Sequence, residues 1–168
     1  VFLQYVKGSQ IIGITGTKGK STTASLIYEI LKESGKDIIL AGNIGKSVLD
    51  TIPAVTSETL VVLEISSFQL EAWEEYQLSP HVALITNISA DHLNYYQTME
   101  EYIEAKRVIA KYQTNDDFLF IRRNDPITDK PRFLKSLKGQ IIRFSKIVLP
   151  KNFKPILKGE HNLLNMAA

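Results

Sequence analysis

The chain has 168 residues, 44% of them hydrophobic and 23% charged, which is enough apolar material for a single globular domain with one core. Its net charge of +2 includes no polybasic block and its apolar runs are too short to span a bilayer, so neither nucleic acid nor a membrane is expected as a partner. The absence of cysteine excludes disulfides, thiol catalysis and zinc–thiolate sites, and it favours a cytoplasmic location.

Short apolar runs alternate with helical patterns along the chain. Strands are expected at 9–14, 37–41, 59–65, 81–87, 117–122 and 140–144, and helices near 21–34, 98–113 and 126–137. This alternation predicts an α/β fold with a mostly parallel sheet flanked by helices. Ligands bind such sheets beyond the carboxyl ends of the strands, so the residues that follow each apolar run are the candidates for a site.

The first predicted strand runs into a glycine-rich segment and then into a helical pattern. A strand, glycine-rich turn and helix in this order point several backbone N–H groups at one spot, where phosphate binds. Lys20 supplies a charge for the β- and γ-phosphates, and Ser21 supplies a hydroxyl for Mg²⁺. The common phosphate loop has a glycine where Ile14 stands, so the alternative is a plain turn into a surface helix. The flanking strand and helix favour a P-loop-type nucleotide site.

Two later strands also end in polar groups. Glu64 ends the run 59–65, with Ser66 and Gln69 shortly after it, and the run 81–87 leads to Asp91 and His92. A single carboxylate or histidine at such a place is usually a solvated loop residue. Several of them beside a phosphate loop favour a Mg²⁺-nucleotide site, because Mg²⁺ is held by one or two carboxylates, a hydroxyl and phosphate oxygens.

Lys106 lies in the apolar stripe of the predicted helix 98–113. The apolar residues three, four or seven places from it are Met99, Tyr102, Ile103, Ile109 and Ala110. A lysine in such a stripe must find a partner, lose its charge or extend its ammonium group out to solvent. The last alternative is the ordinary one for an isolated helix, but the neighbouring metal-type residues favour a functional role.

Four segments resemble, in order, motifs of the Mur ligases of bacterial cell-wall synthesis. They are Gly16-Thr17-Lys18-Gly19-Lys20-Ser21-Thr22, Asn87-Ile88-Ser89-Ala90-Asp91-His92-Leu93, Glu104-Ala105-Lys106 and Gly159-Glu160-His161-Asn162-Leu163-Leu164-Asn165. Two further segments, 42–45 and 64–71, are most similar to the family member that joins UDP-N-acetylmuramoyl-L-alanine to D-glutamate. In this family the substrate carboxylate is phosphorylated by ATP to an acyl phosphate, and the incoming amine then displaces phosphate.

The resemblance implies a role for each candidate residue. ATP would be bound by the loop Gly16, Thr17, Lys18, Gly19, Lys20, Ser21 and Thr22, with Asn162 and Asn165 at the adenine. One Mg²⁺ would be held by Ser21 and Glu64, and a second by His92 and a carbamylated Lys106. The UDP-sugar substrate would face Asn43, Ser66, Gln69 and His92. Lys20, His92 and Lys106 would be the catalytic residues.

The resemblance also implies that residues 1–168 are the central ATP-binding domain of a monomeric ligase. The chain begins without methionine and stops inside an apolar helical pattern at Asn165-Met166-Ala167-Ala168, so we expect a piece of a longer protein. The family's N-terminal domain for the uridine moiety and its C-terminal domain for the amino acid are not expected within these residues. Lys18 and Ala90 depart from the residue types common in the family at those places.

The sequence leaves two alternatives open. A ligase of the folate-polyglutamate type shares the phosphate loop and the metal histidine, although the segment 66–69 does not match it. A stand-alone nucleotide-binding module would also have the loop without the flanking domains.

Overall fold

The computed structural model describes residues 6–7, 10–45, 47–149, 152 and 155–168. Its centre is one parallel sheet of six strands in the order β2-β3-β1-β4-β5-β6. In chain order the strands are β1 (Ile11–Thr15), β2 (Ile38–Gly42), β3 (Leu60–Glu64), β4 (Val82–Ile85), β5 (Phe118–Arg122) and β6 (Gln140–Phe144). The predicted α/β class is confirmed. Residue 9 of the first predicted strand lies outside the described residues.

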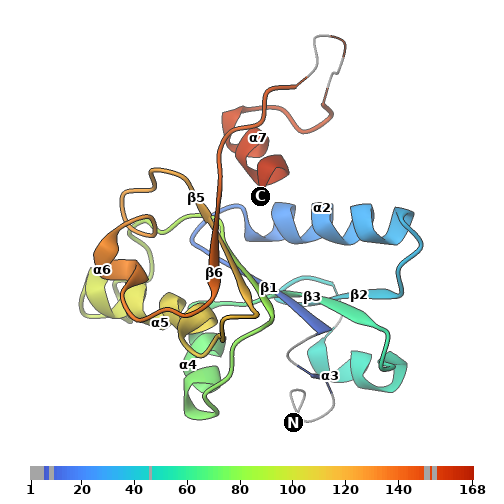
Figure 1. Ribbon diagram of the computed structural model, residues 1–168, viewed down its shortest axis with the longest axis horizontal. Coiled ribbons are helices and arrows are strands. Elements are labelled where there is room, and N and C mark those ends of the chain that lie inside the picture. Colours follow the sequence, from blue (N-terminus) through green and yellow to red (C-terminus); the bar gives the residue numbers. More distant parts are fainter. Residues whose placement is uncertain (1–5, 8–9, 46, 150–151, 153–154) are drawn as a thin grey trace.

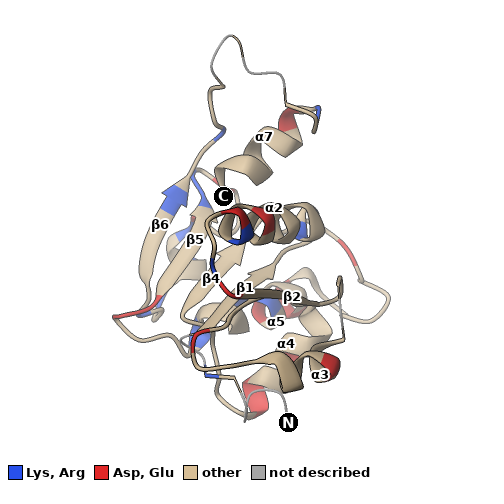
Figure 2. Ribbon diagram, turned by 90° about the vertical axis from the view of Figure 1, so that its right-hand side faces the viewer, with Lys and Arg blue, Asp and Glu red and all other residues tan. Residues whose placement is uncertain are grey.

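Helices cover both faces of the sheet. They are α2 (Lys20–Glu33), α3 (Val48–Thr51), α4 (Ser67–Glu75), α5 (Met99–Lys111), α6 (Pro131–Leu134) and α7 (Glu160–Ala167), with a short 3₁₀ turn, η2 (Ile52–Ala54). Figures 1 and 2 show α2 and α7 on one side of the sheet and α3, α4 and α5 on the other. No helix among the described residues is long and apolar enough to cross a membrane.

The core consists of two apolar clusters, one on each face. Alternate residues of one strand serve the two clusters: Val61 and Leu63 face the larger one with α4 and α5, while Val62 faces the smaller one under α2. A parallel strand buried on both faces must be apolar at nearly every position. This requirement explains the continuous apolar runs in the sequence.

The predicted helix over 126–137 is wrong, because only α6 (Pro131–Leu134) forms there. The Asp125 side chain accepts hydrogen bonds from the backbone N–H groups of Ile127 and Thr128, at 3.0 and 2.8 Å, and so holds a turn. Asn124 adopts a positive φ of 59° just before it. Asn and Asp side chains that bond nearby backbone groups offer the chain an alternative to the helix.

Helix α4 was not among the expected helices. Ser66 and Gln69 form a capping box at its start, in which the Ser66 Oγ accepts from Gln69 N at 3.2 Å and the Gln69 Oε1 accepts from Ser66 N at 2.8 Å. The spacing of serine and glutamine three residues apart is the sequence signal that would have found it.

Candidate functional site

The glycine-rich loop joins β1 to α2, as the sequence predicted. Gly16 and Gly19 have positive φ angles of 144° and 84°. A Cβ on Gly16 would lie 2.1 Å from Thr86 Oγ1, and a Cβ on Gly19 would lie 2.5 Å from Asn165 Oδ1. Both backbone angles favour glycine. At Gly16 there is also no space for a side chain, whereas the neighbour of Gly19 is the end of the Asn165 side chain, which can shift. The loop ends at the first turn of α2, where Ser21 is exposed and Thr22 is half-buried.

Asn87, two residues after the end of β4, positions this loop. Its backbone carbonyl accepts from Thr17 N at 2.9 Å, and its side chain exchanges hydrogen bonds with the backbone N–H and C=O of Lys18 at 3.1 and 2.7 Å. The Lys20 ammonium folds back over the loop and donates to Thr17 O at 3.0 Å. The loop is thus preformed, with Lys20 placed above its backbone.

Glu64 ends β3 next to the loop and is only 3% exposed. Its Oε2 has no hydrogen-bond partner among the described residues. A buried carboxylate without a partner is costly, so its open oxygen fits a cation. No group of three His, Cys, Asp or Glu side chains that could hold a metal occurs in the described part of the chain. A Mg²⁺ here would depend on Ser21 and phosphate oxygens for its other ligands, as Mg²⁺ sites in nucleotide enzymes do.

Lys106 is buried, with 2% of its surface exposed, so the alternative in which its ammonium reaches solvent is wrong. Its Nζ lies 4.7 Å from the centre of the Tyr102 ring. Burial, and secondarily the positive charge of Lys20, lowers the pKa of Lys106 to about 7, although Asp91 opposes the shift. A buried amine with this pKa is partly neutral at physiological pH. The neutral amine is the form that reacts with CO₂ to give a carbamate.

His92 lies in the loop between β4 and α5, with a positive φ of 53°. Its side chain is 47% exposed, and its Nε2 lies 3.7 Å from Asp91 Oδ2. The His92 ring packs edge-on to Phe68, with ring centres 5.3 Å apart. The imidazole therefore remains open to a ligand.

Tyr102 is a site residue that sequence reasoning missed. Its ring lies 6.2 Å from the His92 ring and beneath Lys106, and its hydroxyl is 3.2 Å from Thr17 Oγ1 in the glycine-rich loop. This 1% exposed side chain joins the three predicted parts of the site. Its place one turn before Lys106 on the apolar stripe was a signal for their contact, but not for the contact with Thr17.

The predicted substrate residues lie at the same edge of the sheet. Asn43 follows β2 and is exposed, and its backbone N–H donates to Glu64 O at 3.2 Å. Ser66 and Gln69 are half-buried and are engaged with each other in the capping box of α4. Both residues therefore have a structural role beside the predicted contact with substrate.

The predicted adenine residues approach the loop from α7. Asn165 lines a cavity of about 250 Å³ next to Gly19, and its Nδ2 donates to Asn162 Oδ1 at 3.1 Å. Asn162 does not line the cavity and donates to Lys158 O instead. Asn165 is thus placed for direct contact with a ligand, and Asn162 orients it.

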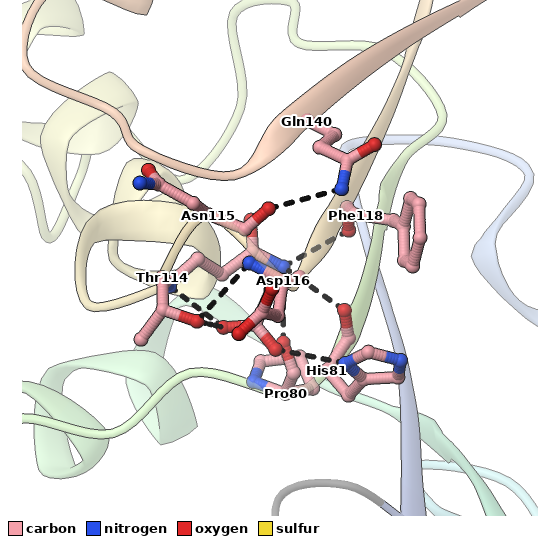
Figure 3. A network of polar contacts seen from close by, with 9 residues as sticks. Pro80, His81, Thr114, Asn115, Asp116, Phe118 and Gln140 are labelled. Carbon is pink, nitrogen blue, oxygen red and sulfur yellow. Dashed lines mark hydrogen bonds and ion pairs between the residues drawn. The ribbon is translucent and has the colours of Figure 1, made fainter.

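A second polar network lies at the opposite edge of the sheet, where β4 and β5 begin (Figure 3). His81 Nδ1 and Asp117 Oδ1 are 2.8 Å apart, and Asp117 Oδ2 accepts from the Thr114 backbone and hydroxyl. The Gln113 amide donates to Pro80 O and Phe118 O. These groups tie strand starts together and are separate from the candidate site.

Comparison with protein families gives one match over most of the chain. The family described as Mur ligase middle domain matches residues 14–153. Two curated relatives are both UDP-N-acetylmuramoylalanine–D-glutamate ligases. The one from Symbiobacterium thermophilum is 42% identical over 136 residues, which are 81% of this chain, and the one from Clostridioides difficile is 44% identical over 135 residues, or 80%. This chain spans 29% of the length of each of these two relatives.

Solved structures show the same fold. A UDP-N-acetylmuramoyl-L-alanyl-D-glutamate–2,6-diaminopimelate ligase superimposes with a TM-score of 0.73 at 23% identity, over 96% of this chain and 42% of its own. A MurF ligase from Thermotoga maritima in complex with ADP gives a TM-score of 0.63 at 22% identity, over 86% of this chain and 34% of its own.

Proposed function

The chain belongs to the Mur ligase family, and we propose that it is the ATP-binding central domain of a ligase that joins D-glutamate to UDP-N-acetylmuramoyl-L-alanine. The family match over residues 14–153 and the names of the relatives support this proposal. A cytoplasmic, monomeric enzyme with its other domains outside residues 1–168 is part of the same proposal.

Lys20 and the loop backbone would bind the β- and γ-phosphates of ATP. Two observations support this role. Asn87 already fixes the loop through the N–H groups of Thr17 and Lys18, and no side chain caps the start of α2, where the first N–H groups of the helix can meet an anion. The solved relative with ADP supports a nucleotide ligand. Asn165 in the cavity beside Gly19 would contact the adenine, with Asn162 holding its amide.

Glu64 and Ser21 would hold one Mg²⁺, and His92 with a carbamylated Lys106 a second. When bound, these ions would neutralise charge on the phosphates during transfer. The unpaired Glu64 oxygen and the lowered pKa of Lys106 support these assignments. Tyr102 would hold His92 and Lys106 in place against the loop.

The reaction would proceed by phosphoryl transfer. The carboxylate of UDP-N-acetylmuramoyl-L-alanine, positioned by Asn43, Ser66, Gln69 and His92, would attack the γ-phosphorus of ATP and release ADP. The amine of D-glutamate would then attack the acyl phosphate and release phosphate, leaving an amide. The chain's contribution is mainly to position the two reactants and to stabilise charge.

The observation that carries the proposal is the loop in which two glycines have positive φ angles beside a buried, unpaired Glu64. Calorimetric titration with ATP and Mg²⁺ tests it. We expect Lys20→Ala to abolish the heat of binding, because the Lys20 ammonium is the charge folded over the loop backbone. Lys36→Ala, at an exposed lysine beyond the far end of α2, should bind as the original chain does. Equal binding by both variants would contradict the phosphate-loop assignment.

The second substrate separates this ligase from a folate-polyglutamate ligase. We expect UDP-N-acetylmuramoyl-L-alanine, and not a folate, to raise the melting temperature of the chain with ATP present, since a ligand that binds only the folded state stabilises it. The reverse result would favour the folate type.

A further inference from the structure

The cavity beside Gly19 has a basic lining with no carboxylate among the described residues that line it. Its basic members are Lys18, Arg122 and His161. Phe144 and Leu164 form an apolar part. An apolar part joined to a cationic part is suited to a ligand that has a ring at one end and negative charge at the other. Lys18 belongs to the phosphate loop, but Arg122 comes from a different strand and has no role in the site described so far.

The register of the sheet shows where Arg122 stands relative to the loop. Thr15 pairs with Ile85, Ile85 with Ile121, and Arg122 with Phe144. One residue further on, Gly16, Thr86, Arg122 and Phe144 therefore lie at one level along the carboxyl edge, on β1, β4, β5 and β6. Neighbouring strands are about 4.8 Å apart, and β5 is the second strand from β1, so the backbone of Arg122 lies about 10 Å from the loop. Phe144 lies on β6, the next strand beyond Arg122.

Arg122 faces the cavity side of the sheet. Phe120, two residues earlier, packs in the cluster under α2, whereas Leu119 and Ile121 pack in the cluster with α5. Side chains alternate along a strand, so Arg122 shares the face of Phe120, where α2 and α7 lie. Figure 2 shows basic segments on β5 and β6 toward α7.

The guanidinium of Arg122 has no carboxylate in ion-pair contact within the described part of the chain. Arg143 on β6, by contrast, is paired with Asp129 through its Nε at 2.7 Å. An arginine without a carboxylate partner keeps all its donors for an anion, and its planar fork matches two phosphate oxygens.

We propose that Arg122 binds the α-phosphate of the nucleotide, between the β- and γ-phosphates in the glycine-rich loop and the base near Phe144. This inference rests on the proposed function, because it assumes that the loop holds a nucleotide. It follows from the order of groups along the edge of the sheet, which matches the order of groups along a nucleoside triphosphate.

Titrations of the 168-residue chain with ATP, ADP, AMP and adenosine test the proposal. Binding is followed by amide chemical shifts, which measure weak affinities. We expect Arg122→Gln to weaken binding of ATP, ADP and AMP about tenfold each, the usual size for one charge-assisted contact, and to leave adenosine unchanged. Arg122→Lys should recover part of the loss, because it keeps the charge but not the fork.

Arg123→Gln is the matched control. Arg123 is the next residue and is also exposed, but it does not line the cavity and its charge acts on Asp129. We expect no change with any of the four ligands. Equal affinities for Arg122→Gln and Arg123→Gln would overturn the inference and leave the proposed function intact. The same conclusion would follow if Arg122→Gln weakened the binding of adenosine as well as that of the nucleotides. If the original chain bound neither ATP nor ADP, the proposed function would fail, and this inference with it.

Discussion

Two ionisable side chains, Glu64 and Lys106, are buried under the carboxyl edge of the sheet at 3% and 2% exposure. Neither has an ion-pair partner among the described residues. Buried groups of this kind lower stability unless a ligand or a chemical change compensates them. A cation at Glu64 and a carbamate at Lys106, as proposed above, would compensate this loss of stability.

Replacing Lys106 should stabilise the chain at the residue scale. Methionine is apolar, has similar length and would remove a buried amine, so Lys106→Met should raise the free energy of unfolding by about 1 kcal/mol, a common size for one substitution. Urea unfolding measures this value. Lys36→Met, at an exposed lysine, should change it little. A large loss of stability in Lys106→Met would mean that the ammonium makes a favourable contact. It would contradict the claim that the buried amine lowers the stability of the chain.

At the scale of elements, the site depends on the segments that leave β3 and β4. The chain after β3 enters α4 through the Ser66–Gln69 capping box, and the chain after β4 passes Asn87 and His92 before α5. Asn87 bonds the glycine-rich loop, and Tyr102 of α5 contacts the same loop. Hydrogen bonds thus connect the ends of β1, β3 and β4 at one edge of the sheet. The His81–Asp117 network connects β4 and β5 at the other edge.

The His81–Asp117 network should give the fold an acid-sensitive element. Burial by itself would raise the pKa of Asp117, but hydrogen bonds from Thr114 and His81 outweigh it, and the net pKa lies below the ordinary value of 3.8. A carboxylate whose pKa is lowered by folding stabilises the protein above its unfolded pKa, and this contribution is lost as pH falls through the folded value. We therefore expect Asp117→Asn to be less stable than the original chain at neutral pH.

The difference between Asp117→Asn and the original chain should shrink as the pH falls below about 4. Urea midpoints from pH 2 to pH 7 measure it. The matched control is Asp116→Asn, because Asp116 is exposed and its carboxylate takes no part in the network. A stability difference for Asp117→Asn that stays constant across this range would show that the charge of Asp117 is not responsible.

At the scale of the whole molecule, the strand order creates the site. The central strand β1 has β3 on one side and β4 on the other, so the chain connections diverge from its carboxyl end. Ligands of open α/β sheets bind in the crevice at such a point. Here Glu64 approaches the loop from β3, Asn87 and His92 approach it from β4, and the cavity extends over β5 and β6.

Binding and ligation should separate in this chain. It spans 29% of the length of each of the two ligases compared above, and the family resemblance implies separate domains for the uridine moiety and the amino acid. We expect the 168-residue chain to bind ATP but to form no UDP-N-acetylmuramoyl-L-alanyl-D-glutamate when all three substrates are supplied. Chromatographic detection of product measures this outcome. Turnover by the chain alone would contradict its assignment as one domain of a larger ligase.

Several features followed from the sequence alone because they depend on near neighbours in the chain. The apolar runs are the six strands, the glycines around Lys20 make the loop, and the stripe around Lys106 is buried. Each is a matter of side-chain period or of backbone angles that only glycine adopts easily. The predicted helix over 126–137 does not form, and the reason is also local, because the turn held by Asp125 competes with it.

Only the tertiary structure decided which of these features meet. The order of strands, the contact of Tyr102 with Thr17, the unpaired Glu64 oxygen and the position of Arg122 between the loop and Phe144 all join residues distant in sequence. Periodicity shows which face of an element is buried but not which element covers it. Strand order and the contacts across the edge result from burying the whole core at once, and no local pattern encodes them.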